Sequence, residues 1–242
     1  MNNLVTSPKS LARVAGVLYL LNAILAGFEF GYVLGKVYIP GDPSASAANV
    51  AANVGLVRIG LVADLAQAAI IVIVGMMLFQ LLKHVGRNLA GAMVILISIA
   101  SAIMCLNDIF QFAAVLVATD PSYARAFGAA GSQSLILLML ELHHYGFLIA
   151  QVFFGLWLFP MGVLAYKSGM FPKALGLALI VGCLCYLAEV IATFLAPGFA
   201  ASIKTFLNIP PTIAELWMVG YLLVVGVKTD LASPQVKAPI GA

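Results

Sequence analysis

Charged residues are scarce in this chain of 242 residues: they make up 9% of it, against 63% hydrophobic residues and a mean hydropathy of +1.10. A soluble globular domain has about 25% charged residues, so this composition excludes one. The sequence also lacks a G-x-S-x-G, an H-E-x-x-H, a phosphate-binding loop and a C-x-x-C pair. No motif therefore points to a named reaction. The net charge of +3 is too small to indicate nucleic-acid binding.

Six long apolar segments dominate the sequence. They run from Leu11 to Leu34, Val54 to Leu82, Leu89 to Val117, Ser134 to Tyr166, Leu175 to Leu195 and Ile213 to Val227. A helix of about 20 apolar residues crosses a bilayer. The sequence therefore predicts an all-α fold, a polytopic transmembrane bundle of six helices, as one domain over residues 1–228. Residues 229–242 contain two prolines and a glycine and are predicted to be a disordered tail.

The distribution of lysine and arginine predicts the orientation. Eight of these residues fall on one side of the six segments (Lys9, Arg13, Lys83, Arg87, Lys167, Lys173, Lys228 and Lys237) and four on the other (Lys36, Arg58, Arg125 and Lys204). Because cytoplasmic loops carry the excess of positive charge, both termini are predicted to be cytoplasmic. The first segment is longer than the apolar core of a secretory signal, so it is expected to be retained. The outer connections are residues 35–53, where a helix is expected to start at Asp42, and 118–133.

Each apolar segment carries one acid. The six are Glu29, Asp64, Asp108, Glu141, Glu189 and Glu215. With the predicted topology they all fall in the outer half of the bilayer and are expected to form one layer. An ionised side chain at the centre of a membrane helix costs roughly 2.5 to 3.5 kcal/mol on the insertion scale. We therefore expect protons or a bound divalent cation to neutralise the layer.

The fourth segment contains the sharpest candidate metal motif, Glu141-x-x-His144. This spacing places a carboxylate and an imidazole on one helical face, as in carboxylate-bridged metal centres. A polar seam follows the same face (Ser134, Leu137, Glu141, His144, Leu148, Gln151 and Gly155), and His143 points elsewhere. A second copy of the motif is missing. Pairing of Glu141 and His144 with neighbouring helices is the commoner arrangement, and a proton relay through His144 is a third.

The candidate site is an outer cavity lined by Asp64, Asp108, Glu141, His144 and Glu189, with Arg58 at its mouth. Arg58 and Asp64 are six residues apart and do not share a helical face. Arg58 is therefore expected either to extend toward the lipid headgroups or to clamp a carboxylate of another helix or an anion. On the third segment Ser98, Ser101, Cys105 and Asp108 form a second seam.

Small residues and cysteines give expectations about packing. Gly27, Gly31 and Gly35 recur at four-residue steps and predict a close approach of a neighbouring helix, and Gly60 predicts another. Pro160 is a candidate for a bend in the long fourth segment. The three cysteines, Cys105, Cys183 and Cys185, lie within apolar segments and are expected to be core residues without a disulfide.

Four motifs together resemble a bacterial membrane family described as domain of unknown function 4386. They are Arg58-x-Gly60-x-x-x-Asp64, Glu141-Leu142-His143-His144-Tyr145-Gly146, Gly155-Leu156-Trp157-Leu158-Phe159-Pro160 and Lys167-Ser168-Gly169-x-x-Pro172. The resemblance covers about residues 8 to 228. It implies six spans and the cytoplasmic membrane of a bacterium as the location, and it implies no reaction or ligand.

Three classes of function stay open. A membrane-embedded enzyme or binding protein would keep a polar site near one face of the bilayer, which fits a one-sided acidic layer. A proton- or cation-coupled transporter or channel needs polar groups that continue toward the cytoplasm, and these are few. In a structural or sensory protein the layer would only join helices. The expected partners are the lipid bilayer and a cation or small ligand, and the sequence does not give the oligomeric state.

Overall fold

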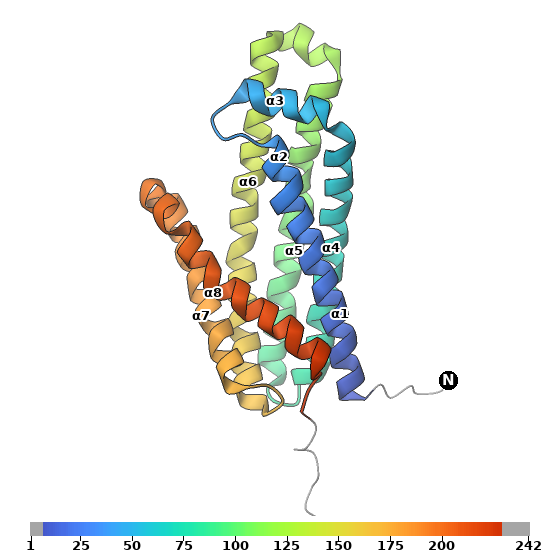
Figure 1. Ribbon diagram of the computed structural model, residues 1–242, viewed down its shortest axis with the longest axis vertical. Helices are drawn as coiled ribbons and strands as arrows, with labels where there is room; N and C mark the ends of the chain where they lie inside the picture. Colours follow the sequence, from blue (N-terminus) through green and yellow to red (C-terminus); the bar gives the residue numbers. More distant parts are fainter. Residues whose placement is uncertain (1–6, 229–242) are drawn as a thin grey trace, which may run out of the picture.

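The computed structural model describes residues 7–228, and Figure 1 shows them as an elongated helical bundle. Six helical stretches are long and apolar enough to cross a membrane. They are α1 (Pro8–Ala26) with its continuation through η1 (Gly27–Val33) and α2 (Leu34–Val37), then α4 (Val54–Leu82), α5 (Arg87–Thr119), α6 (Pro121–Ser168), α7 (Lys173–Leu195) and α8 (Pro197–Val224). These residues contain no strand. The predicted all-α bundle of six spans is confirmed. The predicted disordered tail lies outside the described residues.

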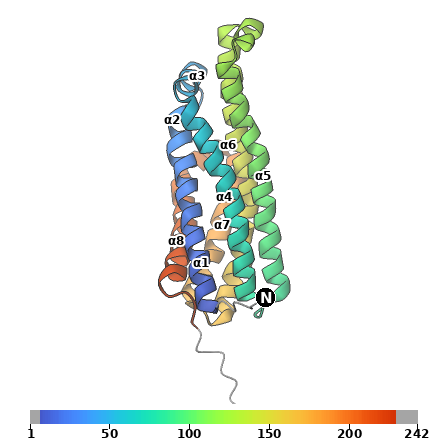
Figure 2. The ribbon, with the colours of Figure 1, turned by 90° about the vertical axis from the view of Figure 1, so that its right-hand side faces the viewer.

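The six spans close into a ring. Each span packs on the one that precedes it along the chain, in the order α1, α4, α5, α6, α7 and α8. Helix α8 also packs on α1. The described chain begins and ends at the same end of the bundle, at the bottom of Figures 1 and 2. That end also holds the α4–α5 and α6–α7 connections. The larger group of lysines and arginines, as far as it is described, therefore lies at one end and the smaller group at the other.

The end of the bundle at the bottom of Figure 1, which we call the inner end after the predicted orientation, contains the larger hydrophobic core. Trp157, Leu78 and Met161 are almost fully buried there. Tyr19 meets the ring of Trp157 edge-on, with 5.9 Å between ring centroids, an arrangement that aromatic quadrupoles favour. A second and smaller apolar cluster holds the outer end together. The polar groups described below lie between the two clusters.

The α6–α7 crossing depends on two glycines. A Cβ atom at Gly176 would lie 2.7 Å from the carbonyl oxygen of Gly162, and one at Gly162 would lie 2.6 Å from the carbonyl oxygen of Gly176. The two backbones are therefore in direct contact, as small residues allow in membrane helices. The predicted close approach at Gly27, Gly31 and Gly35 is wrong, because a Cβ at any of them would meet nothing within 4 Å.

The first outer connection is largely helical. Asp42 caps α3 (Pro43–Ala52): its Oδ1 accepts a 2.9 Å hydrogen bond from the backbone N–H of Ala45. The predicted helix start is thus confirmed. However, this helix does not continue into the second span, because Asn53 leaves the helical region and α4 begins at Val54. Figure 1 shows α3 lying across the outer end of the bundle.

Helix α6 starts earlier than predicted and bends elsewhere. Its N-cap is Asp120, whose carboxylate accepts a 2.8 Å hydrogen bond from the backbone N–H of Ser122. This bond lowers the pKa of Asp120. Gly128, with φ 71°, interrupts the helix, whereas Pro160 lies inside a continuous stretch. A positive φ costs glycine little, so the bend falls there.

The last span and one cysteine also differ from expectation. Helix α8 begins at Pro197 rather than Ile213, and it runs through Pro210 and Pro211. Membrane helices tolerate such prolines where neighbouring groups satisfy the freed carbonyls. All three cysteines are free, as predicted, but Cys105 is exposed rather than in the core.

The α6–α7 contact gives a stability prediction. Gly176→Ala should lower the free energy of unfolding in detergent by about 1 to 3 kcal/mol, because the added methyl group forces two backbones apart. The matched control is Gly91→Ala, since Gly91 lies in α5 with nothing within 4 Å of an added Cβ. The control should be neutral or slightly stabilising. Equal effects of the two substitutions, measured by denaturant titration of helicity, would contradict the close crossing.

Candidate functional site

Seven buried polar side chains gather between the two apolar clusters, and we call them the buried polar centre. They are Glu29 from η1, Asp64 and Gln67 from α4, Asn107, Asp108 and Gln111 from α5, and His143 from α6. All seven are at most 6% exposed. Helical spacing explains their convergence, because Asp64 and Gln67 are three residues apart, and so are Asp108 and Gln111.

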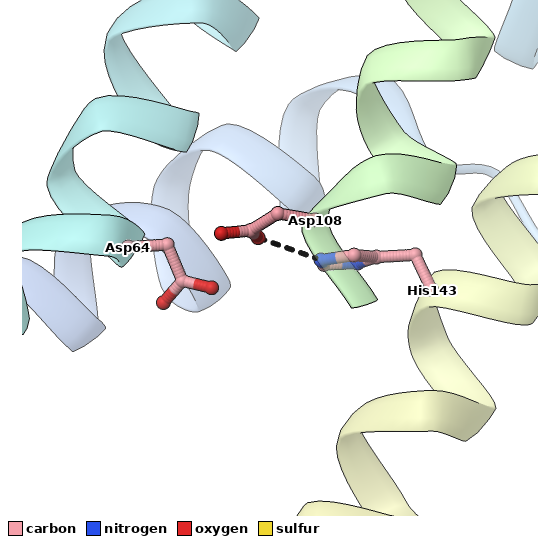
Figure 3. A group of neighbouring side chains, drawn as sticks. All are labelled: Asp64, Asp108 and His143. Atoms are coloured by element: carbon pink, nitrogen blue, oxygen red, sulfur yellow. Dashed lines mark ion pairs between the residues drawn. The ribbon is translucent and has the colours of Figure 1, made fainter. Parts of the chain in front are cut away.

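Three of these side chains face one another as metal ligands would. The nearest ligand atoms of Asp64, Asp108 and His143 all lie within 4.8 Å of one another. Figure 3 shows the carboxylate of Asp108 between the other two side chains, with a dashed line to the imidazole. The distance from His143 Nε2 to Asp108 Oδ1 is 3.6 Å. This is the single ion pair that the described part of the chain contains.

Hydrogen bonds between helices hold the centre in place. Gln111 Nε2 donates to Glu29 Oε1 at 2.7 Å and so joins α5 to η1. Asn107 Nδ2 donates to the backbone carbonyl of His143, also at 2.7 Å, and joins α5 to α6. Gln67 Nε2 donates to Asp64 Oδ1 within α4. Each amide therefore orients or positions an acid or the histidine.

Local backbone features bring these groups close. Glu29 lies in the π-helical segment η1, a feature that often marks functional sites. Its carboxylate rests against Gly60, where a Cβ would overlap Glu29 Oε2, and Asn107 rests against Gly146 in the same way. The predicted close packing at Gly60 is confirmed, and what packs there is an acid of the centre.

Several buried atoms of the centre have no hydrogen-bond partner among the described residues. They are Glu29 Oε2, Asn107 Oδ1, both carboxylate oxygens of Asp108, Gln111 Oε1 and His143 Nδ1. Each such atom costs about 1 to 3 kcal/mol when buried without a partner. No lysine or arginine among residues 7–228 pairs with the three acids. The centre thus has an excess of acceptors and of negative charge.

The structure brings some predicted site residues together and separates others. Asp64 and Asp108 meet. Glu141 and His144 are only partly buried and do not join a group of three candidate ligands among the described residues. His144 instead lies 5.8 Å from the ring of Tyr38. Glu189 accepts a 2.7 Å hydrogen bond from Gln151 Nε2 and lies on the other side of α6.

Sequence reasoning missed His143. It points elsewhere than the seam of Glu141 and His144, as predicted, but that direction is the interior of the bundle. A usable signal existed in the sequence: Ile136, Leu140 and His143 lie on one face of α6 at steps of four and three. His143 is the polar residue among these three. The face is otherwise apolar, and in the sequence it resembles a helical face that contacts lipid.

Arg58 lines a groove on the outside of the bundle. This cavity of about 370 Å³ lies between α4 and α5, and Cys105 and Asp108 also line it. Arg58 itself is exposed. Arg58 and Asp108, a member of the buried polar centre, therefore line the same groove. The expectation that Arg58 lies at the mouth of a functional site stays a prediction.

Two further cavities share walls formed by α1, η1, α6 and α8. One, of about 410 Å³, contains His144, Glu189 and Lys204; the other, of about 190 Å³, contains Gln67 and Glu215. Phe30 and Gln151 line both. The ring of Phe30 also stacks on His143, with 6.4 Å between centroids. Phe30 therefore contacts both His143 and the two cavities, and Gln67 of the buried polar centre lines the smaller cavity directly.

Glu215 departs from the predicted layer. Its two carboxylate oxygens accept hydrogen bonds from the hydroxyls of Tyr19, at 2.7 Å, and Tyr186, at 3.1 Å. Tyr19 precedes Glu29 by ten residues on the same helical stretch, about 15 Å at 1.5 Å per residue. The expectation that all six acids lie at one depth is therefore wrong, and Glu215 lies nearer the inner core.

The fold and the buried acids define a multi-pass α-helical membrane protein. The sequence matches the family described as "Domain of unknown function (DUF4386)" over residues 14–226, so the chain belongs to that family. The predicted resemblance is confirmed. Comparison with curated proteins and with solved structures finds no match.

The tyrosine pair around Glu215 gives a second prediction. Tyr186→Phe and Tyr19→Phe should each lower the free energy of unfolding by about 1 kcal/mol, because each leaves a buried carboxylate oxygen without a donor. Tyr32→Phe is the matched control, since Tyr32 lies on the same helical stretch as Tyr19 and is 54% exposed. Chemical unfolding in detergent measures the difference. If all three variants unfold alike, Glu215 does not depend on these hydroxyls.

Proposed function

We propose that the protein is a membrane-embedded metal-binding protein whose buried polar centre holds a divalent transition metal between Asp64, Asp108 and His143. One observation carries this proposal: three candidate ligand atoms lie within 4.8 Å of one another while neither oxygen of Asp108 accepts a hydrogen bond from the described residues. Two ligand atoms about 2.1 Å from one metal lie about 3.4 Å apart in a tetrahedral site. The 3.6 Å between His143 Nε2 and Asp108 Oδ1 is close to this distance.

The donor set and its charge indicate the kind of cation. Two carboxylates carry two negative charges, so a divalent ion neutralises them, whereas a monovalent ion does not. Imidazole nitrogen is a common ligand of Zn²⁺, Mn²⁺ and Fe²⁺, while Ca²⁺ and Mg²⁺ prefer oxygen ligands alone. Glu29 stays outside the group of three and is held by Gln111. These features favour a transition metal.

Three protein ligands favour an enzyme over a purely structural metal site. Structural zinc sites usually have four protein ligands, whereas catalytic sites have three and leave a position for water or substrate. The smaller cavity, which Gln67 of the centre lines, offers space for a substrate. We therefore propose a metal-dependent membrane enzyme.

A proton- or cation-coupled transporter is the second candidate. Gln67, which donates to Asp64, lines the cavity that extends inward to Glu215, and this continuity favours proton movement along polar side chains. Beyond Glu215 the polar route is thin. Ser98 bonds to the carbonyl of Val94 in its own helix, and the larger apolar core follows. This inner barrier favours the enzyme.

We place the protein in the cytoplasmic membrane of a bacterium with both termini inside. The unequal distribution of lysine and arginine at the two ends of the bundle supports this orientation. The buried polar centre then lies in the outer half of the bilayer. Any substrate would reach it from the lipid or from the outer face.

Metal binding has a direct test. Protein purified in detergent without chelator should contain a transition metal by elemental analysis, and chelator should lower its melting temperature. Zn²⁺, Mn²⁺ or Fe²⁺ should restore it, since a ligand at 100 times its Kd adds about 2.7 kcal/mol. His143→Ala and Asp108→Asn should abolish this restoration. Acidification should abolish it too, because the ligands must be deprotonated to bind metal.

Matched controls separate the candidate ligand sets. His144→Ala and Glu141→Gln change the neighbouring histidine and the acid of the E-x-x-H motif, and both should retain stabilisation by metal. If these two variants lose it and His143→Ala does not, the metal lies at Glu141 and His144 instead. If no metal and no chelator changes the melting temperature of the unaltered protein, protons neutralise the centre and the transporter becomes the better account.

The orientation is tested by reporter fusions. An alkaline phosphatase fused after Lys228 should be inactive, because that enzyme folds only outside the cytoplasm, and a fusion within residues 121–127 should be active. A green fluorescent protein at the same two points should give the opposite pattern. Phosphatase activity after Lys228 would contradict cytoplasmic termini.

A further inference from the structure

The larger of the two cavities that Phe30 lines has features of a second ligand site, independent of the proposed metal. We call it the lateral cavity; its volume is about 410 Å³, and its walls include Leu34, His144, Phe147, Gln151, Glu189 and Lys204. This volume is within the range of about 300 to 1,000 Å³ typical of small-molecule pockets. The walls come from the end of α1, from η1, α2 and the segment after it, and from α6, α7 and α8.

The lateral cavity is lined in part by two helices, α2 and α8, that do not pack closely on each other. Helix α8 packs mainly on α7 and α1, while its first half diverges from α2 in Figure 1. Residues of both α2 and α8, Gly35 and Lys204 among them, line the same cavity. A molecule can therefore enter from the side, which in a membrane-spanning bundle is the side of the lipid.

The lateral cavity contains one positive and one negative side chain that do not pair. Lys204 is exposed at the mouth, and Glu189 is 2% exposed within. The residues that the structure describes contain no ion pair between them. Gln151 donates to one carboxylate oxygen of Glu189, and the other has no hydrogen-bond donor among residues 7–228. A ligand can thus meet a cation at the mouth and an acceptor in the interior.

We propose that the lateral cavity binds the headgroup of a phospholipid that carries a primary ammonium. Its phosphate binds Lys204, and its ammonium donates to Glu189 and to the side-chain carbonyl of Gln151. A buried carboxylate with an amide beside it accepts N–H bonds, which a primary ammonium provides and a quaternary one does not. Leu34, Phe147 and Leu148 supply an apolar wall for the glycerol and the first part of the acyl chains.

A lipid fits the lateral cavity better than a free zwitterion of the same chemistry. The mouth lies between two membrane helices, and most of the wall is apolar, so acyl chains can stay in the bilayer while the headgroup enters. Phe30 forms part of this wall and stacks on His143. The bound headgroup would therefore lie one aromatic ring away from the buried polar centre.

Native mass spectrometry of the detergent-purified full chain tests this proposal. The probes are phosphatidylethanolamine, phosphatidylcholine and phosphatidylglycerol with identical acyl chains, and free phosphoethanolamine as competitor. Phosphatidylethanolamine should bind at least tenfold more tightly than the other two lipids, because only it offers both a phosphate and a primary ammonium. Free phosphoethanolamine at millimolar concentration should not displace it. Displacement would mean a soluble ligand and would overturn the choice of a lipid.

Single substitutions assign the two charges. Glu189→Gln should reduce the preference for phosphatidylethanolamine over phosphatidylglycerol to within about twofold, and Lys204→Gln should weaken binding of all three lipids about tenfold. Lys36→Gln is the matched control, since Lys36 is an exposed lysine of α2 that does not line the cavity. Lys204 is exposed, so its substitution is expected to fold even if Glu189→Gln does not.

The outcomes that contradict the proposal are distinct from those that contradict the metal site. Equal binding of the three lipids, an unchanged preference in Glu189→Gln, or equal effects of Lys36→Gln and Lys204→Gln would each overturn the lipid site. Metal content and stabilisation by metal are measured on the same preparations. A failure of one site leaves the other standing.

Discussion

The burial of acids without a lysine or arginine partner governs the middle of this bundle. Glu29, Asp64 and Asp108 come from three helices and meet in the interior, where the described chain provides no lysine or arginine to pair with them. Unpaired ions in such surroundings cost several kcal/mol each. The helices can stay together only if protons or a cation supply the missing positive charge. The amides of Gln67 and Gln111 each donate to an acid, and they orient the carboxylates without neutralising them.

The rest of the architecture keeps this arrangement from relaxing. Backbone contact between α6 and α7 and the apolar core around Trp157 fix the inner end. Gly60 and Gly146 let the side chains of Glu29 and Asn107 lie against a neighbouring backbone. Because the helices cannot separate easily, the excess of acceptors stays in one place. Preorganisation of this kind is what a metal or proton site needs.

Hydropathy made the spans predictable, and it also limited what could be predicted about the site. In a bilayer the lipid-facing and the interior positions of a helix are both apolar, so periodicity shows that a helix spans but not which face turns inward. Gly27, Gly31 and Gly35 therefore resembled an interface and are not one. His143 was missed for the same reason, since its helical face is otherwise made of residues such as Ile136 and Leu140.

Polar residues were more informative, because polar side chains that meet along one helix are spaced three or four residues apart in the sequence. Asp64 and Gln67 share a face by spacing, and they are bonded in the structure. The depth of Glu215 was not predictable, because the prolines before it hid the first part of α8. A loop in place of those residues puts Glu215 near the outer boundary, whereas the continuous helix carries it to Tyr19.

The acids differ in how many hydrogen-bond donors the protein gives to their carboxylate oxygens, and this difference distinguishes acids that join helices from candidate ligands. Glu215 accepts a hydrogen bond from a hydroxyl at each oxygen and so joins three helices. This structural role explains why an acid is buried there. Glu189 receives one amide donor and faces a cavity. Asp108 has no hydrogen-bond donor at either oxygen within the described chain, although it is almost fully buried. A carboxylate kept in that state brings no stability by itself, and the proposed metal site rests on this observation.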